Sequence, residues 1–96
     1  MPTMNRRSLE VSSRAGRLMA GYLTFGRRPG DTSARTSEAG AGLLVDYAAD
    51  GRVIGMEITS PSVVTLESIN GVLAEVGQPP ATEHELSLLF AARVAG

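Results

Sequence analysis

Short apolar runs separated by turn residues fill the first sixty positions of the chain. Each run mixes β-branched, aromatic or long aliphatic residues, and the breaks between them are rich in glycine, proline, serine and aspartate. The runs that fit strands are residues 8–13, 18–25, 34–38, 43–47 and 52–58. Because short turns join antiparallel neighbours, the pattern predicts a small antiparallel β-meander of four to five strands.

The sharpest local signal is a hairpin over residues 43–58. Two apolar runs flank Asp50-Gly51. Both residue types tolerate the positive φ angles that tight hairpin turns need. The sequence therefore predicts that residues 43–47 and 52–58 pair with each other.

Beyond Pro61 the apolar spacing changes from a period of two to a period near 3.6. The positions on this helical stripe are Leu66, Ile69, Leu73 and Val76, and Glu67 and Glu75 fall off it. Thr65 is placed to cap the helix N-terminus, and Gly77 is placed to end it. A first helix is thus predicted directly after the sheet.

A second helix is predicted after the break at Pro79-Pro80. Thr82 and Glu85 have the T-x-x-E spacing of a capping box. The apolar face of this helix would hold Leu86, Leu89, Phe90 and Val94. Strands followed by two C-terminal helices define an α+β fold, with residues 1–7 as a disordered tail and 8–96 as one domain (8–60 sheet, 61–96 helical part).

The predicted sheet is apolar on both faces. Leu18, Ala20 and Tyr22 would point to one side of their strand, and Met19, Leu23 and Phe25 to the other. One helix layer covers one face, so the other face needs the second helix or a second copy of the protein. The expectation is a homo-oligomer, with a dimer as the simplest form. The plain alternative is that a small domain exposes some apolar residues.

Composition excludes several classes of site. The 96-residue chain has no cysteine, which rules out thiolate catalysis, disulfides and cysteine-based zinc sites, and its one histidine, His84, is too few for a histidine-built site. No cofactor and no metal are expected. No apolar run approaches the length of a membrane span, and Arg6-Arg7 lacks the apolar stretch of an export signal, so a cytoplasmic location is expected.

Charge is divided unevenly along a chain whose net charge is −1. Up to residue 37 there are seven arginines against Glu10 and Asp31, a balance of +5, and the remainder carries eight acidic residues against Arg52 and Arg93, a balance of −6. Near-zero net charge does not favour general nucleic-acid binding. The two parts could attract each other within one chain or between two chains.

Residues 42–58, GLLVDYAADGRVIGMEI, resemble the core motif of the Domain of Unknown Function 2283 family, G-hydrophobic-V-D-Y-D-x-D-G-x-V-V-G-I-E-I. The likeness extends loosely over residues 8–60. The stretch 20–24 (AGYLT) stands where the family has a D-A-L-Y-I strand, and Thr36 and Glu38 stand where it often has Thr and Glu. The resemblance implies a β-rich fold in short bacterial proteins and supplies no established activity and no catalytic residues. The family's acidic turn is replaced here by residues 14–17, RAGR.

Two sets of residues are candidates for binding. Asp46 and Glu57 lie on strands expected to pair, and a carboxylate pair can serve acid/base chemistry or bind a cation, although such residues also serve as polar strand positions paired with arginine. The second set is Arg27, Arg28 and Arg35, an anion-facing patch that could contact phosphate or simply remain solvated. His84, between two glutamates, fits a solvated surface position.

Three classes of function remain open. The favoured one is a non-catalytic domain that acts by self-association or by binding a protein partner. A nucleic-acid-linked regulator, such as an antitoxin-like companion protein, has only the arginine patch in its support. A small oligomeric enzyme would need a site built between subunits from Asp46, Glu57 and arginines.

Overall fold

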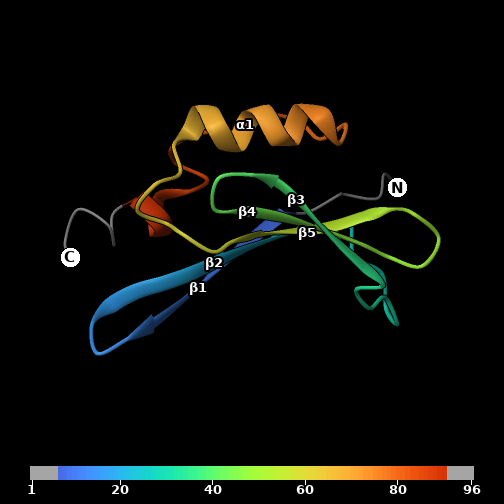
Figure 1. The fold of residues 1–96 in the computed structure, drawn as a ribbon, viewed down its shortest axis with the longest axis horizontal. Coiled ribbons are helices and arrows are strands. Elements are labelled where there is room, and N and C mark those ends of the chain that lie inside the picture. The colour runs from blue at the N-terminus through green and yellow to red at the C-terminus, as the bar shows by residue number, and fades with distance from the viewer. Residues whose placement is uncertain (1–6, 91–96) are drawn as a thin grey trace.

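The structure, a computed structural model, describes residues 7–90, which form one five-stranded sheet and C-terminal helical segments (Figure 1). The elements are β1 (Arg7–Arg14), β2 (Arg17–Phe25), β3 (Arg35–Gly40), β4 (Leu43–Tyr47), β5 (Val53–Ile58) and α1 (Leu66–Glu75). All strand pairs are antiparallel. The α+β class predicted from the sequence is confirmed.

Strand order in the sheet is β1-β2-β5-β4-β3. The β3–β4–β5 segment is a meander, and the loop after β2 carries the chain to the far edge of the sheet before the meander returns to β2. As a result β5, the last strand in sequence, lies between β2 and β4. This central place suits β5, whose residues Ile54, Gly55, Met56 and Ile58 are all buried.

The predicted hairpin over residues 43–58 is confirmed as the pair β4–β5. Its turn is closed by hydrogen bonds from the Ala48 amide to the Arg52 carbonyl (2.8 Å) and from the Gly51 amide to the Ala48 carbonyl (2.9 Å). Gly51 adopts a φ of +92°, a conformation that costs glycine little. Two-residue turns also join β1 to β2, at Ala15 and Gly16, and β3 to β4, at Ala41 and Gly42.

Helix α1 begins and ends as its sequence predicts. Thr65 is the N-cap: its hydroxyl accepts the Ser68 amide proton at 3.0 Å, and the Ser68 hydroxyl accepts the Thr65 amide proton at 2.9 Å. Gly77 follows the helix with a φ of +76°. Of the predicted stripe, Ile69 and Leu73 are fully buried.

The second helical segment is shorter in the described residues than predicted. Thr82 accepts the Glu85 amide proton at 3.1 Å, but the Glu85 side chain pairs with Arg7 instead of returning to Thr82, so only half of the capping box forms. Helical structure spans residues 87–90. The predicted continuation to Val94 lies outside the described residues.

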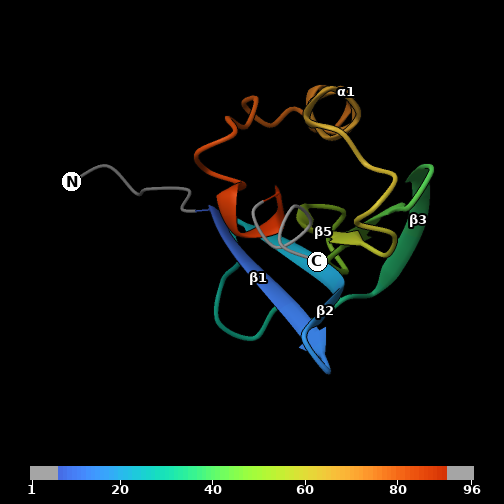
Figure 2. The same cartoon turned by 90° about the vertical axis from the view of Figure 1, so that its left-hand side faces the viewer.

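Both helical segments pack on the same face of the sheet (Figures 1 and 2). One core cluster joins inward-facing residues of β2, β4 and β5 to residues of α1 and of the second segment, including Leu86 and Leu89. The sequence analysis named two possible covers for the second face, the second helix or a second copy of the protein. As far as residue 90, the second helical segment does not cover that face. Within the described part of the chain, no helix covers that face, here called the uncovered face.

Arg7 ties the edge strand β1 to the C-terminal segment. Its guanidinium donates to both oxygens of Glu85, with Nη2–Oε1 at 2.9 Å and Nε–Oε2 at 2.8 Å. It also donates to the carbonyl oxygens of Pro79 and Pro80. Arg7 belongs to the segment assigned to the tail from sequence, yet it is the first residue of β1. Its side chain is 12% exposed, so the ion pair is largely withdrawn from water.

We predict that Arg7→Met, which keeps the stem and removes the guanidinium, lowers the free energy of unfolding by about 2 kcal/mol, because Glu85 and two carbonyls lose their donor. Urea denaturation measures the change. Arg27→Met, at an exposed loop position, is the matched control and should change stability by less than about 0.5 kcal/mol. Equal effects of the two substitutions would contradict a structural role for Arg7.

Candidate functional site

The uncovered face has Tyr22 near its centre. In the strand register Tyr22 lies opposite Glu10 of β1 on one side and opposite Glu57 of β5 on the other. Glu57 in turn lies opposite Leu44 of β4. Residues directly opposite each other project from the same face of a sheet. Tyr22 is thus flanked by two carboxylates.

A hydrogen-bonded chain crosses this face from β2 to β3. The Tyr22 hydroxyl donates to Asp46 Oδ2 at 2.7 Å, and the Thr36 hydroxyl donates to Asp46 Oδ1 at 2.7 Å. Asp46 is 9% exposed and is the buried charged residue among those described. Each carboxylate oxygen therefore has a donor, which offsets the cost of withdrawing the charge from water.

Gly55 makes this arrangement possible. It lies on β5 between the strands of Tyr22 and Asp46, opposite Thr24 on one side and Asp46 on the other. A Cβ built on Gly55 would come within 2.1 Å of the Tyr22 hydroxyl and 2.5 Å of its Cζ. The tyrosine side chain therefore lies directly on the glycine backbone, in a space that any other residue would occupy.

The environment keeps the Tyr22 hydroxyl protonated. Burial, the hydrogen bond to Asp46 and the negative charge of Asp46 raise the pKa of Tyr22 to about 12, and Glu57 adds to the effect while Arg27 opposes it. A neutral phenol at physiological pH acts as a donor to Asp46. The pair is suited to hold the strands in place.

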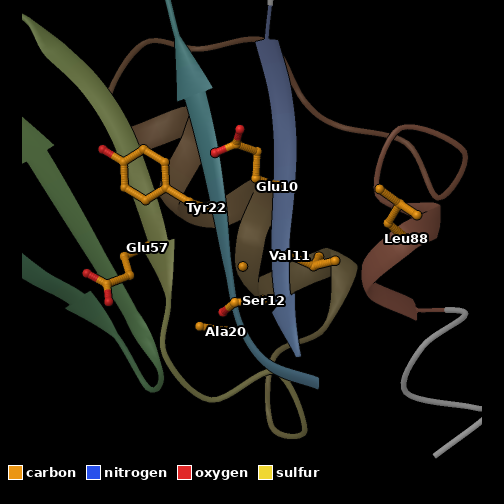
Figure 3. Close-up of a pocket in the computed structure, with 8 residues that line it drawn as sticks. Glu10, Val11, Ser12, Ala20, Tyr22, Glu57 and Leu88 are labelled. Carbon is orange, nitrogen blue, oxygen red and sulfur yellow. The ribbon is translucent and has the colours of Figure 1, made fainter. Parts of the chain in front are cut away.

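A hollow of about 560 Å³ adjoins Tyr22 (Figure 3). Glu10, Ser12, Ala20 and Glu57 line it together with Tyr22. Its lining also includes Leu88, which Figure 3 places beyond β1 on the C-terminal segment. The part next to Tyr22 combines two carboxylates with an aromatic ring.

The two predicted carboxylates share the uncovered face but differ in setting. Asp46 lies opposite Gly55, two residues from Glu57 along β5. Asp46 is occupied by its two donors, whereas Glu57 lines the hollow.

The three predicted arginines are placed in two settings. Arg27 and Arg28 are exposed in the loop after β2, where the Arg28 amide donates to Asp31 Oδ2 at 2.8 Å. Arg35, on β3, stacks over the Tyr47 ring with its Cζ 3.9 Å from the ring centroid. This stacking gives Arg35 a structural contact with the neighbouring strand.

A second charged cluster closes the end of the sheet. Arg52 donates to both oxygens of Asp31, at 2.8 and 3.1 Å, and its Nε donates to Asp50 at 2.7 Å. These bonds lower the pKa of Asp31 and of Asp50 and raise the pKa of Arg52. The charges of this cluster neutralise one another. The cluster also holds the loop between β2 and β3 against the turn of the β4–β5 hairpin.

Sequence reasoning missed the role of Tyr22 and of Gly55. The apolar pattern places Tyr22 among the apolar strand positions and assigns no role to Gly55. The family motif contains a signal for Gly55 and Asp46, which match its Gly and Asp, but Tyr22 stands where the D-A-L-Y-I strand has Leu and is not indicated by the motif. The chemistry of the contact, a phenol over a glycine, is visible only once β2 and β5 are neighbours.

In residues 7–90 no group of three or more His, Cys, Asp or Glu side chains is arranged to hold a metal ion. No helix in that same range is long and apolar enough to cross a membrane.

Comparison with known proteins gives one match. Residues 20–62 match the model of the DUF2283 family, described as a protein of unknown function. This confirms the resemblance found in the sequence, and the matched range contains Tyr22, Thr36, Asp46 and Gly55. No curated protein and no solved structure matches the chain.

We predict that Gly55→Ala lowers the free energy of unfolding by about 2–3 kcal/mol, because the new methyl group displaces Tyr22 from Asp46. Gly71→Ala is the matched control: nothing lies within 4 Å of its added Cβ, and alanine in a helix should stabilise by about 0.5–1 kcal/mol. Chemical denaturation measures both. In a Tyr22→Ala background the cost of Gly55→Ala should largely disappear, and a cost that persists there would contradict the steric explanation.

The raised pKa of Tyr22 predicts a stability loss at high pH. The unfolded chain loses the phenolic proton near pH 10, before the folded protein does near pH 12. Stability contributed by the neutral hydroxyl is therefore complete below about pH 10 and is lost as the pH rises through this window. Tyrosinate absorbance, taken as the difference between the protein and Tyr22→Phe, measures the midpoint. Asp46→Asn should lower it, and a midpoint near 10 in the unmodified protein would refute the assignment.

Proposed function

We propose that the protein is a cytoplasmic, non-catalytic protein-binding domain that self-associates through the uncovered face of its sheet. The observation that carries this proposal is the placement of α1 and of residues 87–90 on one face alone. The opposite face bears Ala20, Tyr22 and Leu44, each only partly buried. Burial of such a strip against a second copy would add to the small core that a short chain can build. Leu18, which the sequence pattern placed beside Ala20, packs against the core cluster instead, because a bulge at Met19 reverses the alternation of the strand.

The hydrogen bonds of Asp46 support a binding function over a catalytic one. A general base must reach a substrate proton, and Asp46 is buried, with each of its oxygens accepting a short hydrogen bond from Tyr22 or Thr36. A fully satisfied polar network on a sheet face adds rigidity and a defined shape. Both properties favour recognition by a partner.

The carboxylates of the uncovered face bear on the nature of the partner. Glu10 and Glu57 flank Tyr22 there, and a phosphate backbone would be repelled by them. This disfavours nucleic acid on this face and favours a protein surface that carries positive charge.

Light scattering after size-exclusion chromatography tests the proposal over a range of concentrations. The expected mass is twice that of the chain. Ala20→Gln, which places a long polar side chain in the strip, should raise the dissociation constant by about tenfold or more. Ala74→Gln, at an exposed position of α1, is the control and should leave it unchanged. A single-chain mass at every concentration would reject self-association.

A further inference from the structure

The β1–β2 hairpin extends past the rest of the sheet. β2 pairs with β5 only from Gly21 to Thr24, while its pairing with β1 continues to Arg14 and Arg17. Residues 12–20 therefore form a two-stranded projection, here called the hairpin arm, which Figures 1 and 2 show leaving the body of the domain. Leu18 and Ala20 lie on this arm.

The tip of the hairpin arm carries an uncompensated pair of like charges. Arg14 and Arg17 lie directly opposite each other at the last register position before the turn, and both are exposed. Like charges in this position repel. Neither arginine makes an ion pair with any residue in the described range 7–90.

The uncovered face carries the complementary charge. Glu10 and Glu57 lie on the two strands that flank Tyr22, and within residues 7–90 neither forms an ion pair. Because one side of the Tyr22 ring rests on Gly55, the other side is directed away from the sheet. Two carboxylates beside an aromatic face are the groups that bind a guanidinium, by charge and by stacking.

Two copies stacked face to face without an arm between them would bring these carboxylates together. Arginines on the arm remove that conflict if each arm reaches the other copy. A two-fold axis makes the contact reciprocal, so that both arms and both faces are used. The chain already contains one arginine stacked on a tyrosine, Arg35 on Tyr47 at 3.9 Å.

We infer that in the self-associated protein the hairpin arm of each copy lies across the uncovered face of the other. Arg14 and Arg17 of one copy then pair with Glu10 and Glu57 of the other, with a guanidinium stacked on Tyr22. This inference rests on the proposed function, because it names the contact by which self-association occurs. It assigns a partner to each of the four charges.

Charge reversal on each side of the contact tests it. Variant one is Arg14→Glu with Arg17→Glu, and variant two is Glu10→Arg with Glu57→Arg. In a dimer of either variant alone, the arm of one copy and the face of the other would carry charges of the same sign. The dissociation constant of each dimer should therefore be at least about tenfold higher than that of the unmodified protein. An equimolar mixture should form a heterodimer of near-normal affinity, because acidic arms then meet basic faces and basic arms meet acidic faces. Analytical ultracentrifugation and native mass spectrometry measure the three samples.

The control variant is Glu67→Arg with Glu75→Arg on α1, which makes the same change in net charge as variant two at exposed positions of the other side of the molecule. It should dimerise normally. If the unmodified protein is a monomer, self-association and the arm contact both fail. If it is a dimer that the reversals leave intact, or if the mixture does not restore pairing, the arm contact is wrong while self-association stands.

Discussion

The pairing of β2 with β5 is the contact on which the rest of the structure depends. It joins the β1–β2 hairpin to the β3–β4–β5 meander, and it consists of four residue pairs, from Gly21 with Ile58 to Thr24 with Gly55. Contacts on both faces of the sheet stabilise this short strand pairing. On the core face Leu23 lies opposite Met56, both fully buried, and on the uncovered face Tyr22 reaches across β5 to Asp46.

A glycine of β2 in the β2–β5 pairing also helps to explain why the helical segments cover only one face of the sheet. At Gly21 the absent side chain leaves room for Leu89, whose Cδ1 would lie 3.3 Å from a Cβ at that position. The C-terminal segment can therefore approach β2 closely, and Arg7 ties it to β1 through Glu85. Once α1 and this segment share the core face, the described residues offer no further layer for the opposite one.

The fold determines which charged residues come close enough to pair. The basic first part of the chain supplies the arginines at the hairpin tip, and the carboxylates of the uncovered face come from both parts, Glu10 from the first and Glu57 from the second. Arg52 and Asp31 show the other possible outcome, in which opposite charges from the two parts pair within one molecule. Within residues 7–90, Arg14 and Arg17 at the hairpin tip and Glu10 and Glu57 on the uncovered face form no ion pair.

The local elements follow from the order of residues in the chain. The Asp50-Gly51 turn, the Thr65 cap and the Gly77 stop each depend on backbone preferences of residues close in the chain, and each is found as predicted. The α+β class and the family likeness over residues 20–62 rest on the same local patterns. Four features depend on how the elements come together in space: the insertion of β5 beside β2, the shared face of the helical segments, the Arg7–Glu85 ion pair and the Tyr22–Gly55–Asp46 contact. These join residues more than twenty positions apart, and strand order, which no local preference encodes, is what brings them together.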